Sequence, residues 1–311
     1  MSFSSEVKEE LTHVGPTCSH CLKATLAALV RIEGTLFKSY QDNYRVEIAT
    51  DVPSVARLII KALHELYALQ TSLTVRRSVL HKTPNYLIEV PSQPHLKEAL
   101  EDMGVLNDRG GLYMGIPASL VAKDCCCAAY LRGAFLGSGF VSDPRGDFHF
   151  EITLENEALA QDLVVLMQRK NISARIMQRR NSYIVYLKSG KAILEFLAFT
   201  GAHQGAIAME NVRVVKSVRN EVNRQNNADL ANQAKAINAA YDQQEAIRRV
   251  EASYGLENLP PALQEIIALR KQHPDVSLKE LGQLASPPIS KSAVNNRMRR
   301  IETLAKELPF Q

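Results

Sequence analysis

Five cysteines in two short segments are candidate ligands for a metal ion. Cys18 and Cys21 are separated by two residues, and a run of three follows at Cys125–Cys127. A structural zinc site needs four nitrogen or sulfur ligands, usually supplied as two pairs. Only Cys18 and Cys21 have the spacing of such a pair. A helix would point the three consecutive cysteines in three directions, so His13 or His20 would have to complete the four ligands. We therefore expect small, partly buried residues here without a metal ion, and no disulfide, because we expect a reducing compartment.

A basic segment near the C-terminus has residue types that recognise DNA. From Ser290 to Ile301 there are four cations and no acid. Arginine pairs with guanine and asparagine with adenine in the major groove, and a capped helix N-terminus favours phosphate. The residues expected to face DNA are Ser290, Lys291, Ser292, Asn295, Asn296, Arg299 and Arg300, with Arg297 at the flank of that face. A solvated or protein-binding face is the alternative.

Two helices and a tight turn are predicted to position this segment. Ser277 and Glu280 have the spacing of a capping box, which opens a short helix. After a proline-containing turn at 286–289, Ser290 is expected to cap a helix over 291–308. The residues of this helix spaced to face inward are Val294, Met298, Ile301 and Ala305. A short helix, a turn and a basic second helix form the helix-turn-helix pattern.

The region before this pattern is predicted to be helical and polar. Within Asn211–Asn227, Arg213, Lys216 and Arg219 follow one another at three-residue spacing and share a helical face. We expect a connecting helix whose cations contact phosphate; a merely solvated connector is the alternative. A further helix is predicted over Ala234–Tyr254. Its expected inward-facing residues are Ile237, Tyr241, Ile247 and Val250.

An apolar segment with small residues occurs twice in the first two thirds of the chain. Ala24–Gly34 corresponds to Ala129–Gly139 at an offset of 105 residues (129 − 24). A helical glycine such as Gly133 costs roughly 0.5–1 kcal/mol relative to alanine, so a packing reason is expected. We predict that the two helices pack closely against each other across a pseudo-twofold axis.

The repeat extends beyond these helices. Each copy is predicted to run helix, hairpin, helix, hairpin, helix, which gives an α+β layer structure. The strands predicted for the second hairpins are 73–79 with 86–90 and 174–178 with 183–187.

The segment Leu131–Gly139 resembles the nine-residue LAGLIDADG motif of a family of homing endonucleases. That resemblance implies paired αββαββα units whose motif helices meet at the axis. It also implies that the eighth motif residue should be an acid, because the two acids hold the divalent metal ions that cleave DNA. Here the eighth positions are Glu33 and Ser138, and a hydroxyl is a poor ligand for Mg²⁺. We expect the scaffold of the nuclease without its activity; a metal-dependent endonuclease that retains a partial acidic site at Glu33 is the alternative.

The combination of this domain with a basic helix-turn-helix resembles the WhiA family of bacterial regulators over essentially the whole chain. The likeness rests on the opening segment Ser2–Glu10 and on the C-terminal segment Ile289–Ile301. The segment Leu259–Ala285 is similar to promoter-reading domains of sigma factors. The resemblance implies a sequence-specific DNA-binding transcriptional regulator, not an enzyme, linked to sporulation, cell division or chromosome segregation. The implied partners are promoter sites in double-stranded DNA, with another transcription factor or RNA polymerase as a further partner.

The expected fold class is α+β, a duplicated αββαββα LAGLIDADG-like domain followed by an all-α helix-turn-helix domain. The expected parts are an N-terminal arm at 1–17, the duplicated domain at 18–205 with repeats of about 18–105 and 122–205, a basic linker helix at 206–230 and the helix-turn-helix domain at 231–311.

Composition is consistent with a chain that works in the cytoplasm. The 311 residues carry a net charge of +4, which is too mild to imply nucleic acid by itself. No apolar run approaches the roughly eighteen residues of a membrane span, and the acidic N-terminus lacks the form of a signal peptide. We expect a cytoplasmic, nucleoid-associated protein that needs no cofactor and does not bind a membrane.

Overall fold

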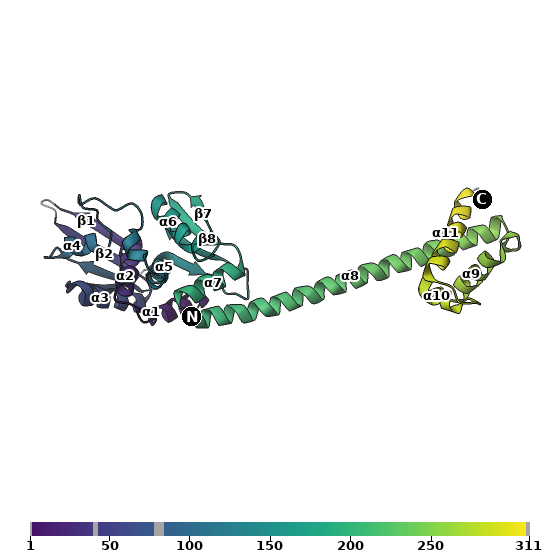
Figure 1. Ribbon diagram of the computed structural model, residues 1–311, viewed down its shortest axis with the longest axis horizontal. Coiled ribbons are helices and arrows are strands. Elements are labelled where there is room, and N and C mark those ends of the chain that lie inside the picture. The colour runs from purple at the N-terminus through teal and green to yellow at the C-terminus, as the bar shows by residue number, and fades with distance from the viewer. Residues whose placement is uncertain (1, 40–42, 78–83, 309–311) are drawn as a thin grey trace. The chain divides into compact units, whose positions relative to one another are not determined.

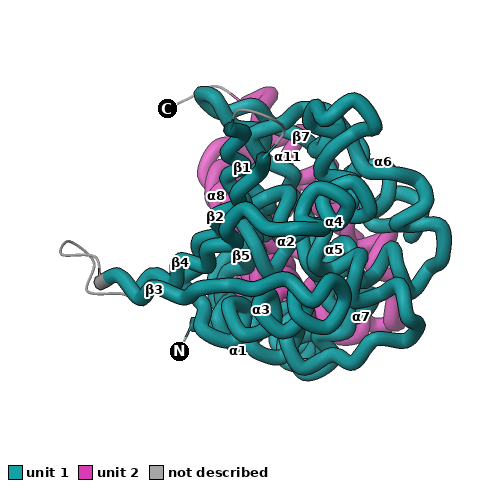
Figure 2. Tube along the Cα trace, turned by 90° about the vertical axis from the view of Figure 1, so that its left-hand side faces the viewer, with its two compact units in different colours: residues 1–216 teal, residues 217–311 magenta. Residues whose placement is uncertain are grey.

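The computed structural model describes residues 2–39, 43–77 and 84–308 (Figure 1). It forms two compact units, residues 1–216 and 217–311, which are coloured separately in Figure 2. No helix in the described part of the chain is both long enough and apolar enough to cross a bilayer.

The first unit contains the two predicted repeats. Its first copy consists of α2 (Cys21–Glu33), β1 (Gly34–Lys38), β2 (Tyr44–Thr50), α3 (Pro53–Tyr67), β3 (Ser72–Arg77), β4 (Pro84–Val90) and α4 (Leu96–Asp102), preceded by α1 (Phe3–Thr12). Its second copy consists of α5 (Asp124–Ser138), β5 (Gly139–Val141), β6 (Phe150–Leu154), α6 (Glu157–Gln168), β7 (Ala174–Arg179), β8 (Ser182–Leu187) and α7 (Gly190–Thr200), with a short 3₁₀ helix at Ala118–Val121 before it. The helix–hairpin order of both copies is confirmed, although residues 78 and 79 of the predicted strand 73–79 lie outside the described part.

Each copy forms one four-stranded antiparallel sheet. The strand orders, β1-β2-β4-β3 and β5-β6-β8-β7, are equivalent. Burial alternates along the central strands, so that Val46 and Ile48 of β2 and Phe150 and Ile152 of β6 are buried beneath the helices. Arg45 of β2, by contrast, points to the opposite face of the sheet and is exposed. Each sheet is thus covered by helices on one side, as an α+β layer structure requires.

The two motif helices pack as closely as the small residues predict. A Cβ atom added at Gly133 of α5 would lie 2.4 Å from the backbone oxygen of Thr25 in α2. The Thr25 hydroxyl donates a hydrogen bond of 3.0 Å to the carbonyl oxygen of Ala129. Gly133 is therefore required by close backbone approach, which explains its presence in a helix interior.

The second unit is all α. It contains the end of α8 (His203–Ser253), a 3₁₀ turn at Leu256–Asn258, α9 (Pro261–Gln272), α10 (Leu278–Leu284) and α11 (Lys291–Glu307). Its core includes Ile247 and Val250 of α8, Ile266 and Ile267 of α9, and Leu281 of α10.

The prediction that Ile237 and Tyr241 face inward is wrong. They are 69% and 62% exposed, whereas Ile247 and Val250 are buried as predicted. Buried residues in this part of α8 begin at Gln243. The segment before it does not form a separate helix either, because no proline or glycine interrupts the chain between Gly205 and Gly255 and α8 continues through it.

Candidate nucleic-acid interface

The helix-turn-helix pattern predicted near the C-terminus is formed by α10 and α11. Ser277 and Glu280 make the reciprocal bonds of a capping box at the start of α10. Ser290 caps α11 by accepting a hydrogen bond of 3.2 Å from the backbone N–H of Ala293. The turn returns closely onto α10, because a Cβ at Gly282 would lie 2.4 Å from the carbonyl oxygen of Ile289. Glycine is thus needed at that position for the turn to pack.

One face of α11 is buried and the opposite face is polar and basic. Val294, Met298, Ile301 and Ala305 are all buried, as the spacing predicts. The predicted DNA-facing residues that are exposed are Ser290, Lys291, Ser292, Asn296, Arg299 and Arg300, and Asn295 is half-buried. Three cations and one amide therefore line an accessible helical face of the width that enters a major groove.

Arg297 has intramolecular partners. Its guanidinium lies 3.3 Å from a carboxylate oxygen of Glu265 in α9 and donates to the carbonyl oxygen of Ala262 at 3.4 Å. Glu265 also accepts a bond of 2.9 Å from the backbone N–H of Ser286 in the turn. These contacts attach α11 and the turn to α9, so Arg297 positions the helix within the unit.

Arg270 is a structural residue of this unit that the sequence did not single out. It is 2% exposed, and its guanidinium donates to the Gln243 side-chain oxygen at 2.9 Å and to the Val276 carbonyl oxygen at 2.7 Å. Burial lowers its pKa from the ordinary value. It joins α8, α9 and the loop before α10, and no local pattern distinguishes it from a surface arginine.

The three cations predicted on the connecting helix lie in different surroundings. Arg213 pairs with Glu210 at 2.6 Å. Lys216 donates to the carbonyl oxygen of Gly146, and its ammonium lies 4.7 Å from the centre of the Phe148 ring. Arg219 is exposed.

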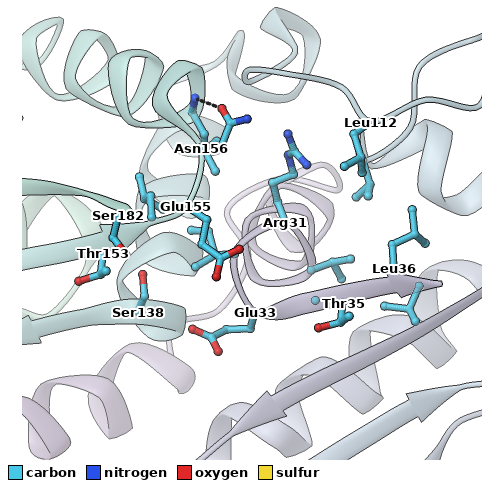
Figure 3. A pocket seen from close by; sticks show the side chains of 17 residues that line it. Arg31, Glu33, Thr35, Leu36, Leu112, Ser138, Thr153, Glu155, Asn156 and Ser182 are labelled. Atoms are coloured by element: carbon cyan, nitrogen blue, oxygen red, sulfur yellow. Dashed lines mark hydrogen bonds between the residues drawn. The ribbon is translucent and has the colours of Figure 1, made fainter. Parts of the chain in front are cut away.

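The two degenerate motif positions meet in a cavity at the C-terminal ends of α2 and α5. It has a volume of about 600 Å³, and Glu33, Ser138, Glu155 and Asn156 are among its lining residues (Figure 3). The Ser138 hydroxyl is buried and, among the described residues, has no hydrogen-bond partner. Because a serine hydroxyl is neutral, position 138 provides no second carboxylate opposite Glu33.

Lys8 of α1 supplies a positive charge to this region. Its ammonium donates to the Gly137 carbonyl oxygen at 3.1 Å. Burial raises the pKa of Glu33; the positive charge of Lys8 opposes that rise, and the negative charges of Asp51 and Glu155 add to it. Burial in turn lowers the pKa of Lys8. The motif positions thus provide one acid and one serine, with an ammonium and the acids Asp51 and Glu155 in the same region.

The cysteines gather at the opposite, N-terminal ends of the same two helices. The sulfur atoms of Cys18, Cys21, Cys125 and Cys126 all lie within 4.8 Å of one another, and all the cysteines are free. Hydrogen bonds from the His20 backbone N–H and then from the Cys21 thiol lower the pKa of Cys18 to about 6. Within residues 2–39, 43–77 and 84–308, this is the one group of three or more histidine, cysteine or acidic side chains whose ligand atoms converge in this way.

Comparison with known proteins places every part of this architecture in one family. The models that match are the WhiA N-terminal LAGLIDADG-like domain over residues 19–106, the WhiA LAGLIDADG-like domain over 127–219 and the WhiA C-terminal helix-turn-helix domain over 222–305. A relative from Heliobacterium modesticaldum, named probable cell division protein WhiA, is 43% identical over 100% of this chain and 98% of its own. The chain belongs to the WhiA family.

Other WhiA proteins agree with this assignment. A relative of the same name from Desulforamulus reducens is 43% identical over 99% of this chain and 96% of its own. The solved structure of full-length WhiA from Thermotoga maritima matches with a TM-score of 0.60 and 24% identity and covers the whole of both chains, which supports the fold. The α+β class, with two LAGLIDADG-like repeats followed by a helix-turn-helix region, is thereby confirmed.

Proposed function

We propose that this WhiA-family chain is a sequence-specific DNA-binding transcriptional regulator that controls cell division and has no nuclease activity. The observation that carries the proposal is the polar face of α11, where Lys291, Asn296, Arg299 and Arg300 stand exposed on a capped helix. Arginine and asparagine make the bidentate base contacts that discriminate sequences in the major groove. The names of the relatives link the family to cell division. We include sporulation and chromosome segregation in the proposal as related processes that this regulator would control.

The proposed partner is a promoter site in double-stranded DNA. Arg219 and Lys291 would contact phosphates, which fix the position of the protein without reading sequence. Another transcription factor or RNA polymerase would be a further partner, and such a regulator would work in the cytoplasm at the nucleoid.

A binding titration tests sequence recognition directly. The full chain is mixed with labelled duplexes recovered from genomic DNA that it enriches, and with shuffled duplexes of the same composition. We expect the recovered duplexes to bind at least 1,000-fold more tightly, at the low end of specific regulators. Equal affinity for both sets would contradict sequence recognition.

The absence of nuclease activity is proposed from the chemistry of the motif cavity. Glu33 has Ser138 as its counterpart and the Lys8 ammonium in its surroundings, so the pair of motif acids that a symmetric metal clamp needs is incomplete. Supercoiled plasmid incubated with the chain and Mg²⁺ or Mn²⁺ should remain uncut. Cleavage that is lost in Glu33→Ala would instead establish the endonuclease.

A further inference from the structure

The four convergent thiols come from two places far apart in the sequence. Cys18 and Cys21 lead into α2, and Cys125 and Cys126 lie in the first turn of α5. The Cys18 sulfur is 3.4 Å from that of Cys21, 3.5 Å from that of Cys126 and 3.6 Å from that of Cys125. Two pairs of cysteines thus meet at the N-terminal ends of the two packed motif helices.

We propose that Cys18, Cys21, Cys125 and Cys126 bind one zinc ion, which ties the N-terminal ends of α2 and α5 together. Zinc in a structural site is held tetrahedrally at Zn–S distances of about 2.3 Å, so its sulfur ligands stand about 3.8 Å apart. The three separations from the Cys18 sulfur, 3.4–3.6 Å, are close to that edge length, and all four sulfur atoms lie within 4.8 Å of one another. Disulfides would need sulfur atoms at about 2.05 Å.

The ends of the two helices favour such an anionic centre. Four thiolates around Zn²⁺ carry a net charge of −2, which needs compensation. His20 and Lys123 are the N-cap residues of α2 and α5, and neither makes a side-chain capping bond. No N-cap side chain therefore occupies either helix N-terminus, and the positive end of each helix dipole lies beside the sulfur atoms.

The exposure of the four residues fits a structural site that is filled from solvent. Cys21 and Cys126 are buried at 2% and 3% exposure, while Cys18 and Cys125 are partly exposed. A closed set of four sulfur ligands leaves no position for a substrate, which is the mark of a structural zinc site. Binding would displace the remaining thiol protons to water, with no change of oxidation state.

A mononuclear ion suits this spacing better than an iron–sulfur cluster. In a cluster the four cysteines are divided among two or four iron atoms, which keeps the sulfur atoms on different irons farther apart than these four. Tetrahedral sulfur sites are typical of zinc, and zinc binds such sites more tightly than ferrous iron. The proposal does not depend on DNA binding, because it concerns the scaffold of the first unit alone.

Metal analysis of the purified full chain tests this site. The protein is prepared under reducing conditions, freed of loosely bound metal by gel filtration and analysed by plasma mass spectrometry. We expect one zinc per chain. We also expect that Co²⁺ exchanged into the site gives the intense sulfur-to-cobalt and visible absorption bands of a tetrahedral tetrathiolate.

Cys127 provides the matched control. It is as buried as Cys126, at 3%, and lies in the next position of α5, but it is outside the convergent group. Cys126→Ser and Cys18→Ser should lose the zinc and the cobalt bands, whereas Cys127→Ser should keep one zinc per chain. Cys18 is partly exposed, so its variant provides a ligand change that spares the core, and circular dichroism verifies that each variant is folded.

Thermal stability gives a second readout, besides the metal content. A chelator should lower the melting temperature of the wild type and of Cys127→Ser, but not that of Cys18→Ser. The proposal is overturned if the reduced, folded wild type takes up neither zinc nor cobalt, if it carries iron in place of zinc, or if Cys127→Ser loses as much metal as Cys126→Ser.

Discussion

At the scale of single residues, two arginines of α11 differ in their surroundings. Arg299 is exposed, while Arg297, two positions earlier on the same helix, is half-buried and bonded to Glu265. Similar side chains thus have different tasks, because their positions around the helix differ. A substitution at Arg299 should change DNA binding, and one at Arg297 should change the attachment of α11 to α9.

Arg299→Ala and Asn296→Ala are each expected to weaken binding to a cognate promoter by about 1–3 kcal/mol, since a bidentate base contact contributes that much discrimination. Binding to a shuffled duplex should change much less. Fluorescence anisotropy with both duplexes measures the difference. Lys306→Ala is the control, because Lys306 is an exposed cation in the last turn of the same helix. Unchanged promoter affinity in both variants would remove α11 as the recognition helix.

Glu33 should give the stability of the first unit a characteristic pH dependence. Burial raises the pKa of its carboxyl above 4.5, so the folded chain holds this proton more tightly than the unfolded chain. The free energy of unfolding is therefore expected to fall as pH rises from about 4.5 through the raised pKa.

Glu33→Gln should abolish that contribution. Urea unfolding of the full chain between about pH 4.5 and pH 7 should show a smaller decline for this variant than for the wild type. Glu65→Gln, at an exposed position on α3, is the control and should keep the decline of the wild type. An equal decline in Glu33→Gln and the wild type would show that Glu33 is not the group responsible.

At the scale of elements, the pairing of α2 with α5 holds the duplicated domain together. Gly133→Ala would place a methyl group 2.4 Å from the Thr25 backbone oxygen, so the helices would have to move apart. Overpacking of this kind costs about 1–3 kcal/mol, which chemical unfolding of the first unit measures. Gly15→Ala, where no atom lies within 4 Å of the added carbon, should cost far less. Equal losses for the two variants would contradict close helix packing.

Much of this element structure could be predicted from the sequence, because its signals are local. The capping box at Ser277, the cap at Ser290 and the inward spacing of Val294 and Met298 are set by short-range rules, and the structure contains all of them. The motif repeat likewise placed Glu33 and Ser138 at equivalent helix ends.

The features that were missed depend on contacts between distant segments or on the extent of packing. The sequence could not show that Lys8 of α1 approaches Glu33, or that Cys125 and Cys126 converge on Cys18. Nor could the sequence show where α8 acquires packing partners. Spacing alone predicts a buried Ile237, whereas the buried residues in this part of α8 begin at Gln243.

At the scale of the whole molecule, the chain combines a duplicated LAGLIDADG-like scaffold with a helix-turn-helix unit. The scaffold keeps the helix pairing of its fold but pairs its one motif acid with a serine and a nearby lysine. The second unit keeps an exposed basic helix. Under the proposed function, residues 217–311 would recognise the DNA sequence, and the first unit would contact phosphates or a protein partner.

The salt dependence of binding should report the phosphate contacts of this arrangement. The logarithm of affinity is expected to fall linearly with the logarithm of salt concentration, because bound counterions are released from DNA. Lys291→Ala should lower the slope by about 1, as the loss of one phosphate contact does. Lys306→Ala should leave it unchanged. A slope in Lys291→Ala equal to that of the wild type would place Lys291 away from the backbone.

The central claim is that α11 selects DNA sequences in the cell, and genome-wide DNA enrichment tests it most directly. The wild-type chain and its Asn296→Ala variant are compared at matched abundance in the organism that encodes the chain. We predict that the wild type occupies discrete promoter sites that share a sequence, and that the variant loses this occupancy while remaining folded and abundant. Occupancy of the same sites by both proteins, or no shared sequence among the sites of the wild type, would contradict the account.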